Sequence, residues 1–287
     1  METETMGVNE RAKLAVRGLY DTQKLRIQLE LRIARLVREG IMTQEEADEY
    51  FAVSFKKFEE AEKEMEKRMW QEVKDRPIIG RWLIHVRGIG PRLAGLLVAN
   101  IGEIERFATV SKLWAYSGLH VLEGHCVKRK SGEKANWNAE LKTTAWKIAQ
   151  SFVKTGGKYR QEYDQYKTRI IEREITRGNV IWGTTDEGDA FPAHYPHGTD
   201  LLTLVKPKFE KKKKGETPKE KIDREKRNQN LNCWTLSRVN NMALRYVAKK
   251  FLSHLWDVWR EIEGLPTRIP YPVEYLGHKR QDDPWDY

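Results

Sequence analysis

The sequence contains very little cysteine. Cys126 and Cys233 are the only two among 287 residues, and they lie far apart along the chain. Two separated cysteines exclude a disulfide-stabilised scaffold and are typical of a protein from a reducing cytosol. Neither belongs to a Cys-x-x-Cys pair. His120, His125 and Cys126 lie in one short segment, but zinc would require a fourth ligand, so we expect no metal site there.

Long hydrophobic runs are also absent. No stretch approaches the roughly 18 consecutive apolar residues that a membrane-spanning helix requires. The first ten residues are polar and acidic, unlike a secretory signal peptide. We therefore expect a cytoplasmic protein, either associated with a nucleoid or in the cytoplasm of a host cell, with no membrane partner.

Acidic residues are fewer than basic residues. Lys and Arg number 52 against 42 Asp and Glu, which gives a formal net charge of +10. A basic balance of this size favours a polyanionic partner, most commonly nucleic acid. A solvated basic surface with no specific partner is the alternative. Hydrophobic residues make up 39% and charged residues 33%, a composition that suits long amphipathic helices.

Residues 1–77 are predicted to form a long helical hairpin. Apolar residues recur at helical spacing from Asn9 to Glu39 and again after Thr43, which makes a capping box with Glu46. The first apolar stripe holds Leu25, Leu29, Ile33 and Leu36, and the second holds Phe51, Phe55, Phe58, Met65 and Met69. We interpret the stripes as the seam of an antiparallel coiled coil, which also offers apolar surface for homo-oligomerisation.

The rest of the chain is predicted to be helical with one long insertion. We expect a compact domain over 78–157, C-terminal helices over 158–177 and 223–264, and an extended tail over 265–287. Residues 178–222, with several Pro and Gly and a lysine run, are expected to form a flexible basic insertion. Residues 206–227 suit either a phosphate-binding arm or a solvated linker. The predicted fold class is all-α.

The most informative motif is the turn Arg87-Gly88-Ile89-Gly90 between two apolar segments. Trp82 to Val86 is expected to form a short first helix. Pro91 suits the first position of a second helix, because its missing N–H costs nothing there. Glycines allow a sharp turn and close approach of the backbone to another surface. Together these residues predict a helix-hairpin-helix, with Ile89 inserted into the core.

A helix-hairpin-helix predicts binding to DNA. The unpaired N–H groups and the positive dipole end of the second helix favour an anion, so contacts go to phosphates rather than base edges. The residues expected to bind DNA here are Arg87, Gly88, Ile89, Gly90 and Arg92. RNA is a second candidate partner. A structural turn or a protein contact is the alternative interpretation of the same pattern.

Four segments around the turn occur in a recognisable order. They are Val86 to Pro91, Leu96 to Gly102, Arg106-Phe107 and Leu113 to Leu119. In order and spacing they resemble the C-terminal domain of the insertion-sequence-110/116/902 transposase family. The resemblance covers about Arg81 to Ala149, and the preceding helical hairpin is similar to the coiled coil of that family.

The resemblance implies a function in moving DNA. Family members combine a RuvC-like acidic nuclease domain with a serine nucleophile in the C-terminal domain and a guide RNA. The family's serine lies in a Ser-Gly-Gly stretch, and the nearest match here is Ser131-Gly132-Glu133. The resemblance therefore implies Ser131 as the catalytic residue. The basic residues around it are expected to contact DNA: Lys128, Arg129, Lys130 and Lys134.

One part of the family's pattern has no counterpart in this sequence. The acidic nuclease domain precedes the coiled coil in the family, whereas fewer than ten residues precede the predicted hairpin here. We therefore expect no metal site, no cofactor and no enzymatic activity of the chain on its own, with Mg²⁺ relevant only beside a nuclease partner. A surface serine in a DNA-contacting loop is the alternative role for Ser131.

Three functions follow from these observations. The preferred one is a transposase-like DNA-binding protein of a mobile element or virus. The second is a subunit of a DNA recombinase or transposase that uses a serine nucleophile with acidic residues from a partner. The third is an architectural protein that coats DNA.

Overall fold

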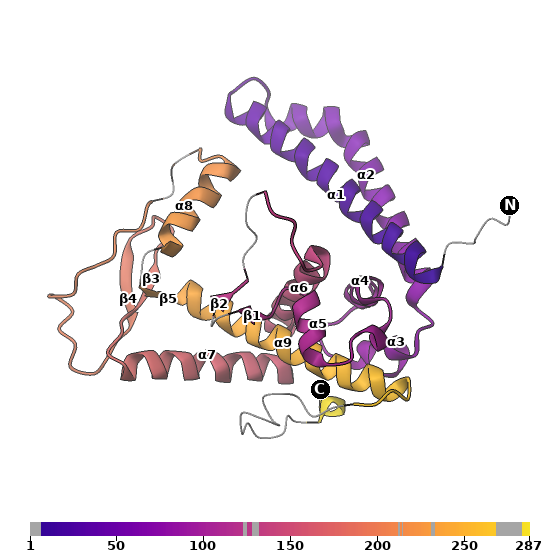
Figure 1. Ribbon diagram of the computed structural model, residues 1–287. Helices are drawn as coiled ribbons and strands as arrows, with labels where there is room; N and C mark the ends of the chain where they lie inside the picture. The colour runs from indigo at the N-terminus through magenta and orange to yellow at the C-terminus, as the bar shows by residue number, and fades with distance from the viewer. Residues whose placement is uncertain are drawn as a thin grey trace. The chain divides into compact units, whose positions relative to one another are not determined.

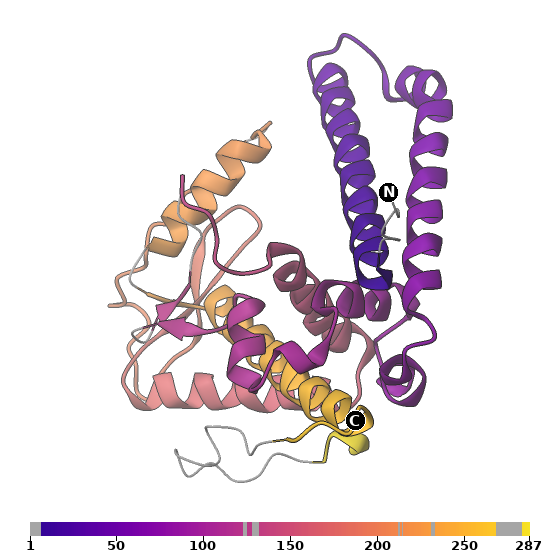
Figure 2. The same cartoon turned by 45° about the vertical axis from the view of Figure 1, so that its right-hand side comes forward.

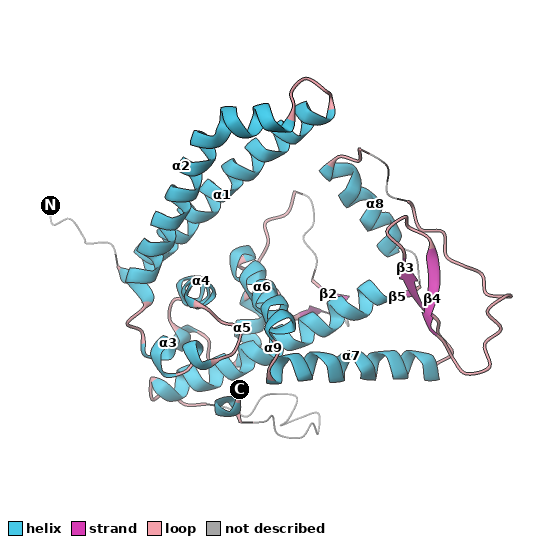
Figure 3. Ribbon diagram, turned by 180° about the vertical axis from the view of Figure 1, so that it is seen from behind, coloured by secondary structure: helices cyan, strands magenta, loops and turns pink. Residues whose placement is uncertain are grey.

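The computed structural model describes residues 7–122, 125–127, 132–211, 213, 215–230, 233–267 and 283–287. The described residues form nine α-helices and five short strands (Figures 1 and 3). The all-α prediction is confirmed, since the strands are confined to a two-stranded and a three-stranded sheet. No helix in these ranges is long and apolar enough to cross a membrane. The chain divides into two compact units, Met1–Gly157 with Ala248–Tyr287, and Lys158–Val247.

The first unit begins with a long antiparallel hairpin of two helices, α1 (Val8–Arg38) and α2 (Gln44–Val73) (Figure 2). The predicted capping box is present: the Thr43 backbone N–H donates to Glu46 Oε2 at 2.8 Å, and Thr43 Oγ1 accepts from the Glu46 N–H at 3.2 Å. Ile33 and Met69 of the predicted stripes are buried. The coiled-coil geometry itself stays a prediction.

Short helices follow the hairpin and form the centre of this unit. In chain order they are α3 (Pro77–Arg81), η1 (Leu83–His85), α4 (Pro91–Ile101), η2 (Ile104–Arg106), α5 (Val110–Tyr116) and α6 (Ala139–Thr155), with strands β1 (Val121–Leu122) and β2 (His125–Cys126) before α6. Every residue of α4 from Ala94 to Ile101 is buried, because almost all of them are apolar and the helix is packed against α2 and α6.

The last part of α9 (Leu236–Ile262) completes this core. Trp256 and Trp259 are buried, and Trp256 Nε1 donates to the Phe107 carbonyl at 2.7 Å. A short turn, η3 (Pro284–Asp286), lies at the end of the chain, and its Pro284 carbonyl accepts a hydrogen bond from Trp82 Nε1 at 3.1 Å. Residues 268–282 of the predicted tail lie outside the described residues.

The second unit differs from the loop expected over 178–222. It contains α7 (Lys158–Thr176), β3 (Ile181–Thr184), β4 (Ala190–His194), α8 (Pro218–Asn230), β5 (Trp234–Thr235) and the first part of α9. The sheet order is β4-β3-β5, and the parallel pairing of Ile181 with Trp234 divides the helix expected over 223–264. These strands are only two to five residues long and depend on pairing between distant segments, so local patterns do not reveal them.

Part of the charge of the basic stretch 206–227 is neutralised within this unit. Arg224 Nε lies 2.8 Å from Glu216 Oε1, and Lys211 Nζ lies 2.9 Å from Asp189 Oδ1. Arg227 is paired with Glu210 in the same way. This pairing leaves less positive charge for a partner than the residue count suggests.

Candidate nucleic-acid interface

The predicted hairpin motif is observed as a turn between η1 and α4. Trp82 interrupts the first arm, with φ of −136°, so the helix expected over Trp82–Val86 is instead α3 followed by a single 3₁₀ turn. Ile89 is only 7% exposed, which confirms that it is inserted into the core. Pro91 occupies the start of α4, as predicted. That this turn forms a DNA-binding helix-hairpin-helix stays a prediction.

Gly88 packs against α6. Its φ is +99°, and a Cβ at this position would lie 2.6 Å from Thr155 Oγ1 and 3.1 Å from Phe152 Cδ1. Its carbonyl accepts a hydrogen bond from Ser151 Oγ at 2.6 Å. The close approach that glycine permits at position 88 is therefore an approach to another helix of the same unit.

Gly90 has a different environment. A Cβ at this position would meet nothing within 4 Å, and its φ of −91° and ψ of 175° are open to any residue. Gly90 is the N-cap of α4 and offers no side chain to the helix, so no side-chain cap is present. Pro91 has no N–H, which leaves the backbone N–H groups of Arg92 and Leu93 as the unsatisfied donors of the first turn.

Cations lie on both sides of this helix start. Arg87 is exposed, and its aliphatic chain lies along Gly157, where a Cβ would be 3.3 Å from Arg87 Cδ. Arg92 Nη1 forms an ion pair with Glu66 Oε2 of α2 at 3.2 Å. Lys147 of α6 lies with its ammonium 5.2 Å from the centre of the Tyr20 ring. Burial, followed by the charge of Arg92, lowers the pKa of the Lys147 ammonium.

Most of the basic loop after β2 lies outside the described residues. Lys128, Arg129, Lys130 and Ser131 lie outside the described residues, so their predicted roles stay predictions. Lys134 is described and exposed. Of the residues predicted to bind DNA, Arg87, Gly90 and Arg92 lie around the start of α4.

A polar network that was not predicted from the sequence connects α4, α5 and α6. Asn138 Nδ2 donates to Asn100 Oδ1 at 3.3 Å and to the Tyr116 hydroxyl at 3.2 Å, and Asn138 Oδ1 caps α6 by accepting from the Leu141 N–H at 2.9 Å. Asn100 is only 2% exposed. An asparagine inside the otherwise apolar stretch Leu96–Ile101 was the available signal.

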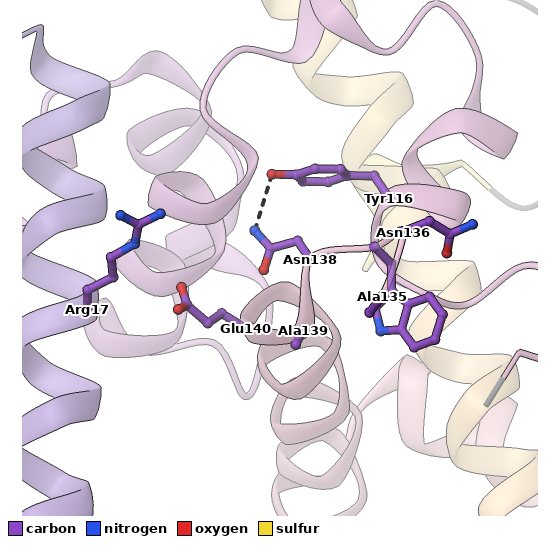
Figure 4. A pocket seen from close by; sticks show the side chains of 8 residues that line it. Arg17, Tyr116, Ala135, Asn136, Asn138, Ala139 and Glu140 are labelled. Carbon is purple, nitrogen blue, oxygen red and sulfur yellow. Dashed lines mark hydrogen bonds between the residues drawn. The ribbon is translucent and has the colours of Figure 1, made fainter. Parts of the chain in front are cut away.

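A cavity of about 460 Å³ lies beside this network, at the start of α6. Its walls come from α1, α5 and the segment that leads into α6 (Figure 4). The residues that line it are Arg17, Tyr116, Ala135, Asn136, Trp137, Asn138, Ala139 and Glu140.

Residues 80–165 match the model of the transposase IS116/IS110/IS902 family. The matched segment contains the turn at Gly88–Gly90, α4, α5, α6 and the start of α7, and it confirms the resemblance seen in the sequence. It covers less than a third of the 287 residues. A comparison with curated proteins gives no match.

Proposed function

We propose that the protein, with its transposase-type segment at residues 80–165, is a DNA-binding protein of a mobile element or virus that contacts the phosphate backbone at the start of α4. The match supports a transposase-like function in a mobile element. The uncapped helix start at Gly90, open on the side where a Cβ would be, is the observation that carries the proposed mode of contact.

The chemistry of this helix start suits a phosphate. Two unsatisfied N–H donors and the positive end of the helix dipole act on the same point, and an anion there gains hydrogen bonds and charge stabilisation together. Arg87 and Arg92 extend the positive surface on either side. Because such contacts reach phosphates and not base edges, binding is expected to depend little on sequence.

Binding to duplex DNA is expected to weaken steeply with salt. Arg87, Arg92, Lys147 and the helix start can together neutralise about three phosphates, which gives a slope near −3 in the logarithm of the affinity against that of the salt concentration. Fluorescence anisotropy with a labelled duplex measures the slope. Replacing Lys147→Gln should reduce its magnitude by about 1 and weaken all sequences alike.

The matched control is Lys112→Gln, which removes an exposed lysine from α5. It should leave the slope almost unchanged. A duplex affinity that is insensitive to salt, or equal slopes for the Lys147 variant and the unchanged protein, would contradict phosphate binding at this surface.

Glu66 is expected to compete with phosphate for Arg92. The ion pair at 3.2 Å occupies the guanidinium, whose side chain is 43% exposed. Replacing Glu66→Gln removes this competitor and should tighten duplex binding roughly threefold, with little change in stability because exposed pairs contribute little. Titration at constant salt measures the change. Glu64→Gln, which removes a carboxylate that pairs with Arg68 on α2, is the control and should give a smaller gain.

A further inference from the structure

The cavity at the start of α6 carries unsatisfied polar groups. Figure 4 shows the Arg17 side chain of α1 and the Glu140 side chain of α6 pointing toward each other across it. No ion pair joins them, and within the described part of the chain neither side chain has a hydrogen-bond partner. The exposed side-chain amide of Asn136 likewise has no hydrogen-bond partner among the described residues. The cavity therefore presents a cation, a carboxylate and an amide, all available to a ligand.

The Glu140 carboxylate makes this cavity unfavourable for a phosphate. Glu140 stands in the first turn of α6, where its negative charge opposes that of an anion and offsets the helix dipole. A carboxylate only accepts hydrogen bonds, so its partner must bring donors. The ligand must also bring acceptors, because Arg17 only donates.

A planar group with donors and acceptors on one edge fits these requirements. Unpaired nucleobases have such an edge, and proteins hold them by contacts to it and by stacking on aromatic side chains. Guanine has two adjacent N–H donors, which match the two oxygens of one carboxylate, and an acceptor oxygen beside them. Tyr116 and Trp137 add aromatic surface to the lining of the cavity, whose volume is about 460 Å³ and which is open to solvent.

The cavity is connected with the cations near α4 through Tyr20. Burial raises the pKa of the Tyr20 phenol, and the charges of both Glu140 and Arg92 act on it. The Lys147 ammonium lies over the ring of the same tyrosine. Glu140 at the cavity and Arg92 near the start of α4 are therefore both close enough to Tyr20 for their charges to act on it.

We propose that this cavity binds an unpaired guanine of a nucleic acid whose backbone lies on Arg92 and Lys147, with Glu140 accepting from the Watson–Crick edge of the base. This assignment rests on the proposed DNA-binding function and adds a preference to it. The protein would then prefer DNA with an extrahelical or single-stranded guanine over fully paired DNA.

The test compares three labelled duplexes of the same length: fully paired, with one bulged guanine, and with one bulged thymine. The unchanged protein should bind the guanine bulge about tenfold tighter than the paired duplex, as expected for one bidentate base contact. Glu140→Gln should abolish this preference and leave the affinity for the paired duplex within about twofold. Glu105→Gln, an exposed carboxylate on η2, is the control for the change of charge and should keep the preference.

The outcomes separate the two proposals. Equal affinity for all three duplexes with intact duplex binding overturns the guanine site and leaves the proposed function standing. A preference that persists in Glu140→Gln, or a loss of binding to all duplexes in that variant, also overturns the site. If the unchanged protein binds none of the duplexes, the proposed function fails and the guanine site fails with it.

Discussion

Replacing Gly90→Asp is expected to weaken duplex DNA binding about 10- to 50-fold while leaving the protein folded. An aspartate at the N-cap accepts hydrogen bonds from the first turn of α4, so the N–H groups proposed for phosphate are consumed, and its charge repels the phosphate as well. The backbone at Gly90 has φ of −91°, and a Cβ meets nothing within 4 Å. The thermal midpoint should therefore stay the same or rise slightly, since aspartate is a better N-cap than glycine.

Two variants at the same position separate the effect of helix capping from that of charge repulsion. Gly90→Asn caps the helix without adding charge and should weaken binding by less than aspartate does. Gly90→Ala adds only a methyl group and should have the smallest effect on affinity. Anisotropy titrations and thermal unfolding measured on the same samples give both quantities. Unchanged DNA affinity in Gly90→Asp, with the fold intact, would show that the start of α4 does not bind DNA.

Replacing Gly88→Ala is expected to destabilise the first unit by about 2–4 kcal/mol. The φ of +99° strains any residue with a Cβ, and the added methyl would lie 2.6 Å from Thr155 Oγ1 and 3.1 Å from Phe152 Cδ1. Relief requires the Thr155 side chain to rotate and give up its hydrogen bond to the Ser151 carbonyl, or α6 to move away from the turn. Movement of α6 also weakens the hydrogen bond from Ser151 to the Gly88 carbonyl. Urea unfolding followed by circular dichroism measures the loss.

Gly40→Ala is the matched control for backbone strain alone. Gly40 has φ of +71°, and a Cβ there would meet nothing within 4 Å. Its substitution should cost about 1 kcal/mol. The difference between the two variants measures the packing of Gly88 on α6, and Thr155→Ala in the Gly88→Ala background should recover part of it. Equal losses at positions 40 and 88 would mean that α6 adapts to the methyl group without cost.

The two glycines of the turn show which features could be predicted from the sequence and which could not. The turn, the inserted Ile89 and the helix start at Pro91 follow from local chemistry, and the structure contains them. The same local chemistry treats Gly88 and Gly90 alike, as two residues without a Cβ. Only the position of the end of α6, where Ser151 lies 63 residues after Gly88, makes one of them a packing residue and leaves the other open.

Long-range contacts explain the other differences as well. The capping box at Thr43 involves residues three apart and was predicted correctly. The pairing of Ile181 with Trp234, and the ion pair between Arg92 and Glu66, join segments that are distant in sequence. Asn138 could be suspected as a helix cap, but its contact with Asn100 requires α4 and α6 to be neighbours. Such partners are set by tertiary packing and leave no periodic pattern.

The interrupted course of the chain through the first unit has a consequence for its folding. The chain leaves this unit after Gly157 and returns at Ala248, so the whole second unit is synthesised before the core of the first can close. The bond from Trp256 to the Phe107 carbonyl spans 149 residues. Contacts of such long sequence separation slow folding. Until they form, apolar side chains that pack on Phe251 of α9, such as Trp82 and Phe152, remain exposed. A chain that ends near residue 247 is therefore expected to aggregate during expression, even though it contains the entire turn at Gly88–Gly90.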